Sequence, residues 1–461
     1  MGSLVENDRT KLETHLTEWL SEHRIPGAAV AVVDGAELAY AQGFGARDLE
    51  DNAPATPETL FGMGSCTKSF TAAAVMQLVE RDMFAVDDAV SNYLPHLEDA
   101  PGETITLGDL LTHTSGMPSD GSAHQLITRP LGMGHNEVPL SSDDDFRRHV
   151  EGSIDRRVTD RHTNFYYNSG YTMLGLVVEE VSGQPFTVYV EDHILAPLGM
   201  DRSTFAKDAF EAEEDRMTPY LERDGKTTQA GFPFDPLLHA PGGLLSSMVE
   251  MATYLRMYIG DGTFDGTTVL SPASVAEMTT PVGTRGRYLD GREVGYGYGL
   301  MVEEFLGDRL IGHGGGIAVS NAWFGYLEDA ELGVAIACTT GPEAHPMFVG
   351  PAILALLKGE PPEAVVPHYR LVEALETAAG EYTDNRGIGT ATVERVGGAL
   401  RLEAEEGVWG EELLFTPTTI DDRRLVCTTT MVSGIEREAR FEFEDGEVDL
   451  FFERARLTQD G

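Results

Sequence analysis

Apolar residues recur with a helical period in the first part of the chain, interrupted by short runs typical of strands. Thr10 to Glu22 carries Leu12, Leu16, Trp19 and Leu20 on one face, which predicts an amphipathic helix. Gly27–Asp34 and Glu37–Gly45 flank an Asp-Gly turn signal and predict a strand pair. The segments that follow predict helices over Ser65–Arg81 and Tyr171–Val181, strands over Ala318–Tyr326 and Leu332–Thr339, and a last short helix ending at Leu357.

The pattern changes after Leu357. Residues 358–367 contain several prolines, which stop regular structure, and this segment is predicted to be a linker. From about Glu381 the apolar residues alternate, as in Ala399–Glu403 and Arg440–Glu444, which predicts short strands of a small all-β barrel or sandwich. We therefore expect a first domain over residues 1–357, a linker over 358–367 and a C-terminal β domain over 368–461.

Charge separates this chain from most proteins. It has 76 Asp and Glu against 33 Lys and Arg, a formal net charge of −43, and only five lysines. Nucleic acid and anionic membranes are excluded as partners of the whole surface, because both require clustered cations. Such charge density destabilises a compact state unless salt screens it, which suggests a source with a molar-salt cytoplasm. An ordinary acidic protein is the alternative.

The chain carries no recognisable targeting or metal-binding motif. No run reaches the ~18 apolar residues of a membrane helix, and the first residues lack the pattern of a secretory signal. Cys66, Cys338 and Cys427 lie far apart without a CxxC motif, which argues against disulfides or a cysteine zinc site. The acidic run 143–145 is predicted to start a helix rather than bind metal. We expect a soluble cytoplasmic protein without cofactor or metal.

The strongest chemical signal is Ser65-Cys-Thr-Lys68 at the start of a predicted helix. Residues three apart share a helix face, so the amine of Lys68 can lie near the hydroxyl of Ser65. Free backbone N–H groups at the helix start can stabilise an anion beside them. A nucleophile, a base and an anion stabiliser are thus expected within one turn. The alternative interpretation of this motif is a serine that caps the helix and a lysine on the surface.

Two further motifs point to the same site. In Tyr166-Tyr167-Asn168, residues two apart face the same way if the segment is extended, so Tyr166 could relay a proton while Asn168 orients substrate or lysine. In His313-Gly314-Gly315-Gly316, glycines at a strand end permit close approach of a backbone or ligand. Taken singly, either motif is explained as well by a packed tyrosine or a structural histidine.

Together and in this order, the three motifs resemble the serine β-lactamase and penicillin-binding-protein superfamily, and most closely its class C β-lactamase, esterase and D-aminopeptidase branch. The stretches Ile105–Pro118, Phe165–Gly175 and Ala240–Ser247 also look like that branch. The resemblance extends over about residues 10–357. It implies an α+β fold, with a five-stranded antiparallel sheet flanked by helices and an all-helical subdomain between the first and third motifs.

The resemblance also implies roles for matching positions. Ser65 would form an acyl-enzyme, Lys68 would act as base, and Tyr166 would share the proton transfers. Asn168 and the third motif, from His313 to Gly315 and Gly316, would bind the substrate, and the N–H groups of Ser65 and Gly316 would form the oxyanion hole. The C-terminal part resembles, in position and strand pattern, the small β-barrel appendages of some of these hydrolases.

One departure bears on the substrate. Many relatives have Lys where this chain has His313, and a mostly neutral imidazole is a weaker anchor for a carboxylate. We therefore expect a serine hydrolase acting on an ester or amide, including D-residue peptides. A β-lactamase or D-Ala-D-Ala carboxypeptidase is the first alternative, and a catalytically silent binding or scaffolding protein the second. A small-molecule or peptide substrate is expected, and the oligomeric state is left open. His124, His135 and His239 are expected to be structural or at the surface and not catalytic, and the loop 119–142 carries no signature.

Overall fold

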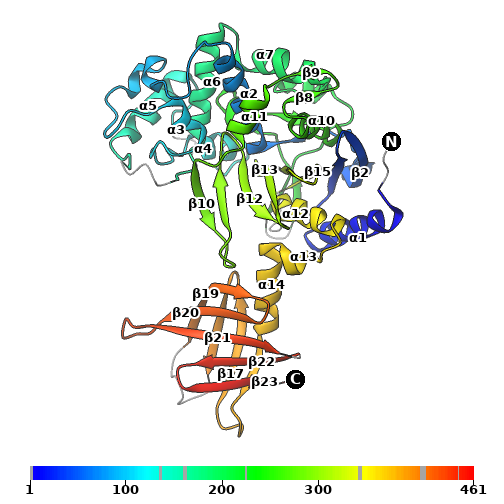
Figure 1. Cartoon of the computed structure of the whole chain (residues 1–461), viewed down its shortest axis with the longest axis vertical. Coiled ribbons are helices and arrows are strands. Elements are labelled where there is room, and N and C mark those ends of the chain that lie inside the picture. Colours follow the sequence, from blue (N-terminus) through cyan, green and yellow to red (C-terminus); the bar gives the residue numbers. More distant parts are fainter. Residues whose placement is uncertain are drawn as a thin grey trace. The chain divides into compact units, whose positions relative to one another are not determined.

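A computed structural model describes residues 4–133, 138–158, 164–223, 226–340, 345–404, 412–444 and 446–460. By contacts the chain forms two compact units (Figure 1). Unit 1 comprises residues 1–285 and 294–357, and unit 2 comprises residues 286–293 and 358–461.

A nine-stranded sheet forms the centre of unit 1, in the order β10-β11-β12-β13-β14-β15-β1-β2-β3. The pairs are antiparallel, as in Ala31↔Ala335 between β1 and β15 and His313↔Phe324 between β13 and β14. The central strands are buried along almost their whole length, so both faces of the sheet must be covered. The strands are β1 (Gly27–Asp34), β2 (Glu37–Asp48), β3 (Ala53–Pro54), β10 (Gly283–Arg287), β11 (Glu293–Tyr296), β12 (Met301–Phe305), β13 (Asp308–Gly316), β14 (Ser320–Leu327) and β15 (Leu332–Thr339).

Helices cover the two faces of this sheet. Helix α12 (Pro346–Leu357) packs on β13 to β15 and contacts α1 (Glu6–Glu22). Helix α10 (Met248–Ile259) packs on β1, β14 and β15. A side chain at Gly350 would collide with Trp323, which shows how closely α12 approaches β14. The other helices of unit 1 are α2 (Thr67–Glu80), α3 (Leu107–Leu111), α4 (Ser122–Thr128), α5 (Asp143–Ile154), α6 (Asn168–Ser182), α7 (Phe186–Val190), α8 (Lys207–Ala212), α9 (His239–Gly242) and α11 (Pro272–Met278).

The region between the first and third motifs is largely helical. The acidic run 143–145 starts α5, with Ser142 as its N-cap, and Gly183 ends α6 in a left-handed conformation with φ 72°. Three short hairpins or strand pairs interrupt the helices: β4 (Phe61–Gly62) with β7 (Leu245–Ser246), β5 (Tyr220–Arg223) with β6 (Lys226–Gln229), and β8 (Thr263–Phe264) with β9 (Thr267–Thr268). The subdomain is therefore not purely helical.

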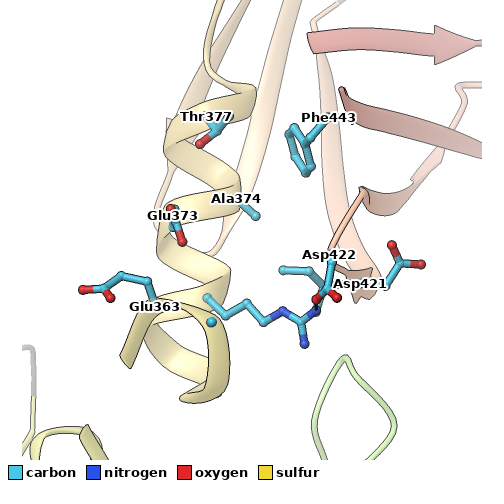
Figure 2. Close-up of a pocket in the computed structure, with 10 residues that line it drawn as sticks. Glu363, Glu373, Ala374, Thr377, Asp421, Asp422 and Phe443 are labelled. Atoms are coloured by element: carbon cyan, nitrogen blue, oxygen red, sulfur yellow. Dashed lines mark hydrogen bonds and ion pairs between the residues drawn. The ribbon is translucent and has the colours of Figure 1, made fainter. Parts of the chain in front are cut away.

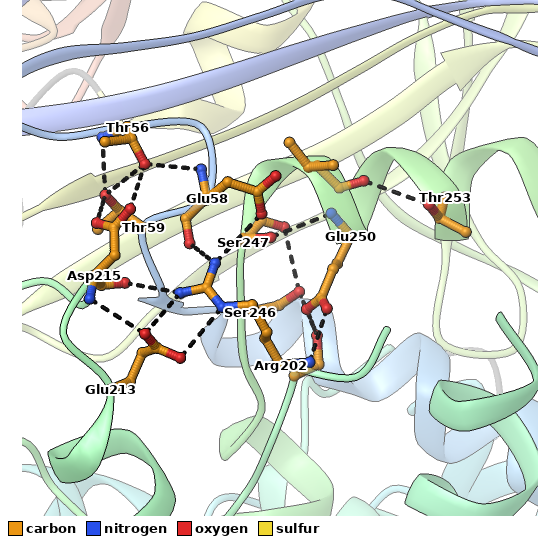
Figure 3. A network of polar contacts seen from close by, with 12 residues as sticks. Thr56, Glu58, Thr59, Arg202, Glu213, Asp215, Ser246, Ser247, Glu250 and Thr253 are labelled. Atoms are coloured by element: carbon orange, nitrogen blue, oxygen red, sulfur yellow. Dashed lines mark hydrogen bonds and ion pairs between the residues drawn. The ribbon is translucent and has the colours of Figure 1, made fainter. Parts of the chain in front are cut away.

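A polar network anchors the segment that leads into the Ser65 turn (Figure 3). The Arg202 guanidinium donates to the Glu58 carbonyl at 2.5 Å and pairs with Glu213, and its backbone N–H donates to Glu250 at 2.8 Å. Asp215 accepts hydrogen bonds from the Thr56 and Thr59 hydroxyls. Glu250 is 8% exposed, and its burial raises its pKa. These contacts fix residues 56–59 just before β4.

Unit 2 contains a closed eight-stranded antiparallel barrel preceded by two helices. Its core is apolar, with residues such as Tyr382, Phe415, Phe441 and Leu450 pointing inward. The barrel strands are β16 (Gly380–Thr383), β17 (Thr390–Val396), β18 (Ala399–Ala404), β19 (Leu413–Asp421), β20 (Arg424–Thr430), β21 (Glu436–Glu444), β22 (Glu447–Phe452) and β23 (Ala455–Gln459).

The linker prediction for residues 358–367 is wrong in its secondary structure. The segment contains α13 (Pro362–Val365), and Pro367 begins α14 (Pro367–Ala378), so the C-terminal region is not all-β. Proline stops a helix from within, but its fixed φ and missing N–H suit the first helical turn, and both helices have proline there. The prolines thus start helices instead of breaking structure.

The predicted fold class is confirmed: an antiparallel sheet with helices, followed by a β-barrel. The sheet has nine strands where five were expected, because short strands extend its edges. None of the helices in the described ranges is long and apolar enough to cross a membrane.

Candidate active site

Ser65 lies in a tight turn against the end of β13. It belongs to a single 3-10 turn, Gly64–Cys66, and α2 begins at Thr67, two residues later than predicted. A Cβ on Gly64 would lie 2.5 Å from the Gly316 backbone nitrogen, and one on Gly315 would lie 2.0 Å from the Met63 carbonyl oxygen. Only glycines permit this approach, so the backbone nitrogens of Ser65 and Gly316 come close together.

Lys68 is the buried centre of the site. Its side chain is 0% exposed, and Nζ lies 3.0 Å from Ser65 Oγ, 2.7 Å from Asn168 Oδ1 and 2.8 Å from the Pro241 carbonyl oxygen. The 3-10 turn of Ser65 continues directly into α2, so the spacing of three residues brings Ser65 and Lys68 together. The contacts to Asn168 and Pro241 are long-range and come from α6 and α9.

The surroundings of Lys68 favour a neutral amine. Burial lowers its pKa well below the ordinary value, and the positive charge of Arg285 lowers it further. A neutral amine has two N–H donors and one lone pair. The oxygens of Asn168 and Pro241 can only accept, and they lie at the two shortest distances, so they take both N–H groups. The lone pair is left for the hydroxyl proton of Ser65.

Tyr166 and Asn168 both lie beside this amine. The Tyr166 ring centroid lies 4.8 Å from Lys68 Nζ. Burial raises the pKa of Tyr166, so the phenol is protonated near neutral pH. Tyr167 turns the other way and donates to Asp120 at 3.1 Å. The extended segment ends at Tyr167, because Asn168 is already the first residue of α6.

His313 is placed differently from its expected contact with substrate. The side chain is 1% exposed, Nδ1 donates to the Gly314 carbonyl oxygen at 2.6 Å, and Nε2 lies 2.9 Å from the Tyr296 hydroxyl, which can donate to it. Burial, with a smaller contribution from the charge of Arg285, lowers its pKa well below the ordinary value. Both nitrogens are thus occupied by protein groups and the ring is neutral.

Two residues beside the site were not singled out from the sequence. His113, in a left-handed conformation with φ 60°, packs 4.3 Å from the Tyr166 ring and accepts the Tyr167 backbone N–H at 3.1 Å. The exposed Arg285 on β10 places its guanidinium carbon 4.8 Å from the Tyr166 ring centroid. His113 lies in a stretch that carries the family resemblance, which could have drawn attention to it. Nothing around Arg285 in the sequence marks it.

The remaining predicted histidines lie in other settings. His124 is exposed on α4, and burial lowers the pKa of His239, at the start of α9, to about 4. His135 lies outside the described residues. Within the described ranges, no group of three or more His, Cys, Asp or Glu side chains could hold a metal ion.

Comparison with known proteins defines the class of this fold and site. Residues 9–357 match the Beta-lactamase family, so the chain belongs to this family. Residues 362–458 match a second family, the Pab87 octamerisation domain. The chain is therefore a β-lactamase-fold protein with an added barrel domain, of the penicillin-binding-protein-like kind.

Individual relatives agree with this assignment. The structure of the octameric penicillin-binding protein homologue from Pyrococcus abyssi is 34% identical, with a TM-score of 0.86 over 98% of this chain and 100% of that chain. Protein flp of Staphylococcus aureus (strain MW2) is 28% identical over 54% of this chain and 48% of its own length, so the chain spans about half of that relative. A D-stereospecific amidohydrolase from Streptomyces sp. shares the fold, at 24% identity and a TM-score of 0.59 over 71% of this chain and 94% of that chain.

Proposed function

We propose that this protein is a serine hydrolase that forms an acyl-enzyme at Ser65. The single observation that carries the proposal is the buried Lys68 amine, whose Nζ lies 3.0 Å from Ser65 Oγ. A surface lysine and a capping serine would not produce this arrangement. The fold and family support hydrolysis in general, and the roles of the reacting residues are part of what we propose.

In the acylation step, Ser65 Oγ attacks the substrate carbonyl carbon while its proton passes to Lys68 Nζ. The carbonyl π electrons move to oxygen, and the N–H groups of Ser65 and Gly316 would stabilise that oxyanion. Each such donor contributes about 3 kcal/mol. As the tetrahedral intermediate collapses, the bond to the leaving alcohol or amine breaks, and the departing group takes a proton through Tyr166 from Lys68.

In the second step, water takes the place of the leaving group. Tyr166 and Lys68 would accept a proton from water as its oxygen attacks the ester carbon. Collapse of the second intermediate breaks the bond to Ser65 Oγ, which regains its proton, and the acid product leaves. Asn168 would hold Lys68 in place throughout, through the 2.7 Å contact of its amide oxygen with Nζ.

Replacing Ser65 by alanine should abolish hydrolysis of a p-nitrophenyl ester and labelling by a fluorophosphonate probe, because no other hydroxyl group in the described ranges is hydrogen-bonded to Lys68. Peptide mapping of the labelled wild type should place the probe on Ser65. The matched control is Ser21→Ala, at an exposed serine in α1, which should keep full rate and labelling. Equal rates in wild type and Ser65→Ala would refute the acyl-enzyme.

The substrate class is proposed as an ester or amide, including amides of D-amino acids. The support is the neutral, internally satisfied His313, which offers no cation to a substrate carboxylate. Arg285 favours a second candidate, a β-lactam or D-Ala-D-Ala peptide, since its exposed guanidinium brings a positive charge beside Tyr166. The two candidates differ in whether the substrate carries an anion near the scissile bond.

A substrate panel in high salt separates these candidates. It contains p-nitrophenyl acetate, the D and L forms of phenylalanine amide, nitrocefin and a peptide ending in D-Ala-D-Ala, each corrected with Ser65→Ala. We expect the ester and the D-amide to turn over, with D preferred to L by about tenfold or more. Faster turnover of nitrocefin or the D-Ala-D-Ala peptide would favour the second candidate and leave the acyl-enzyme intact.

We further propose that the protein assembles into an octamer through unit 2. The support is the match of residues 362–458 to an octamerisation domain, together with the octameric homologue, which this chain covers fully. The protomer mass is 50.1 kDa, so light scattering should report about eight times this value. The assembly and the catalytic proposal stand independently of each other.

A further inference from the structure

Two turns at one end of the barrel carry exposed apolar side chains. Val432 is 82% exposed, Ile388 79% and Ile435 47%, in a chain of net charge −43. Consecutive strands of the closed barrel are antiparallel, so the turns after β16, β18, β20 and β22 lie at the same end. Ile388 lies in the turn after β16, and Val432 and Ile435 form the turn after β20. We name these three residues the apolar rim.

The turns that carry the apolar rim are held by hydrogen bonds. In the turn after β20, the Met431 N–H donates to the Ile435 carbonyl oxygen at 2.9 Å, and Gly434 adopts φ 79°. In the turn after β16, Asp384 Oδ1 accepts the Ile388 backbone N–H at 2.9 Å. Because these hydrogen bonds hold the turns in one conformation, the apolar side chains cannot fold back onto the barrel and stay exposed to water. The turn after β20 thus presents two exposed apolar side chains, those of Val432 and Ile435, to the solvent.

The opposite end of the barrel contains a cavity with complementary properties (Figure 2). It has a volume of about 370 Å³ and lies between α13, α14 and the turn after β19. Ala374 and Phe443 face each other across it, and Ile420 also lines it. Carboxylates surround this apolar floor, and Arg370 is held to one of them, Asp422, at 2.6 Å. We name it the helix–barrel cavity.

Charge supports a match between the two ends. Arg386 and Arg454 are exposed in turns at the end that carries the apolar rim, and neither forms an ion pair within the described residues. The helix–barrel cavity is lined by four carboxylates, from Glu363, Glu373, Asp421 and Asp422. Apolar side chains flanked by arginines thus suit an apolar floor ringed by carboxylates. This charge complementarity applies between separate copies of the chain, since the two surfaces lie at opposite ends of one barrel.

We infer that the turn after β20 of one copy, carrying Val432 and Ile435, docks into the helix–barrel cavity of the next copy. The inference rests on the proposed self-association and identifies its contact. Different surfaces meet in such a contact, so it is heterologous, and a rotation that closes upon itself produces a ring. A ring, or two stacked rings, is compatible with eight copies.

Variants of both surfaces test the contact by light scattering in high salt. Val432→Asp places a charge on the apolar turn, and Ala374→Trp fills the cavity, so each should lower the assembly mass. Val396→Asp, at a 47% exposed valine that ends β17, is the matched control and should leave the mass unchanged. Far-ultraviolet circular dichroism checks that each barrel remains folded.

Crosslinking then distinguishes this contact from its alternatives. The natural cysteines are all buried, so Val432→Cys and Thr377→Cys, at an exposed residue that lines the helix–barrel cavity, introduce accessible thiols. Upon oxidation, the double variant should give a ladder of covalent multimers, while either single variant should stay monomeric on a denaturing gel. Dimers formed by Val432→Cys alone would show that the turns meet each other, and would overturn the inference.

Each result also separates the contact from the proposals on which it depends. A wild type that is monomeric would overturn both the octamer and the contact. A wild type that assembles while Val432→Asp and Ala374→Trp assemble equally well would overturn the contact alone. Ester hydrolysis through Ser65 is measured separately and is unaffected by either outcome.

Discussion

Lys68→Ala should lower the acylation rate by about 10³-fold while the protein stays folded. The loss follows from removing the only amine beside Ser65 Oγ among the described residues, so that its proton must pass to water. Stopped-flow measurement of the burst with a p-nitrophenyl ester reports this step directly. The site should remain folded because no carboxylate in the described ranges pairs with Lys68, so its removal leaves no buried partner charge, and water can occupy the space beside Asn168 and Pro241.

The control for this variant is Lys207→Ala. Lys207 is exposed on α8 and pairs with Glu211 at 3.7 Å, so its loss should change neither the burst nor the thermal midpoint. Lys68→Ala should retain its near-ultraviolet circular dichroism, which separates lost chemistry from lost structure. An acylation rate equal to that of the wild type would show that Lys68 is not the base.

The pH profile tests the same base without removing it. Only the neutral amine of Lys68 accepts the Ser65 proton, so kcat/KM for a neutral ester should rise with pH through the lowered pKa of Lys68 and then level off. The Arg285 charge contributes to lowering that pKa, so Arg285→Gln should move the rising limb to higher pH and Arg285→Lys should not. A limb that moves to lower pH, or stays in place, would contradict this electrostatic assignment.

Transfer from about 1 M salt to about 10 mM salt should unfold the protein, because the screening length grows from about 3 Å to about 30 Å. The net charge of −43 then repels itself across the molecule. Surface ion pairs do not remove the excess. Arg401, for example, already contacts Glu394, Glu403 and Glu412, which leaves three carboxylates sharing one cation. Far-ultraviolet circular dichroism during dialysis records the transition.

The control for desalting distinguishes screening from general protection by a solute. Sucrose at matching osmolality stabilises compact states without screening charge, so it should fail to replace the salt. Returning the salt should restore the signal if unfolding is reversible. A thermal midpoint that is the same at low and high salt would contradict the proposed halophilic origin and leave an ordinary acidic protein.

The local pattern of apolar residues is enough to predict an element when nearly all of its residues have the same degree of burial. Strand Gly27–Asp34 has the same bounds in the structure as in the prediction, since it is buried up to Asp34, where a turn follows. The prediction for the proline-rich segment after Leu357 is wrong in its secondary structure. A proline in a sequence can mark either the end of a helix or its first turn, and here it marks the first turn. Only the neighbouring residues in space distinguish these outcomes.

The candidate site divides in the same way. The order Ser65, Lys68, Tyr166, Asn168 and His313 is visible in the chain, because each motif is a short local pattern. Which of them meet is decided by tertiary contacts between residues about 100 or more apart, such as Asn168 and Pro241 on Lys68. The same packing buries His313 and brings Arg285 over Tyr166, where no local pattern indicated it.

By itself, the sequence determined the charge, the two-part organisation and the three motifs that carry the candidate chemistry, because these depend on composition and on neighbours along the chain. The tertiary structure alone decided the ionisation of Lys68, the closed barrel and the apolar rim. Burial and long-range electrostatics arise only when distant segments pack together, and no local pattern encodes how much water each group loses.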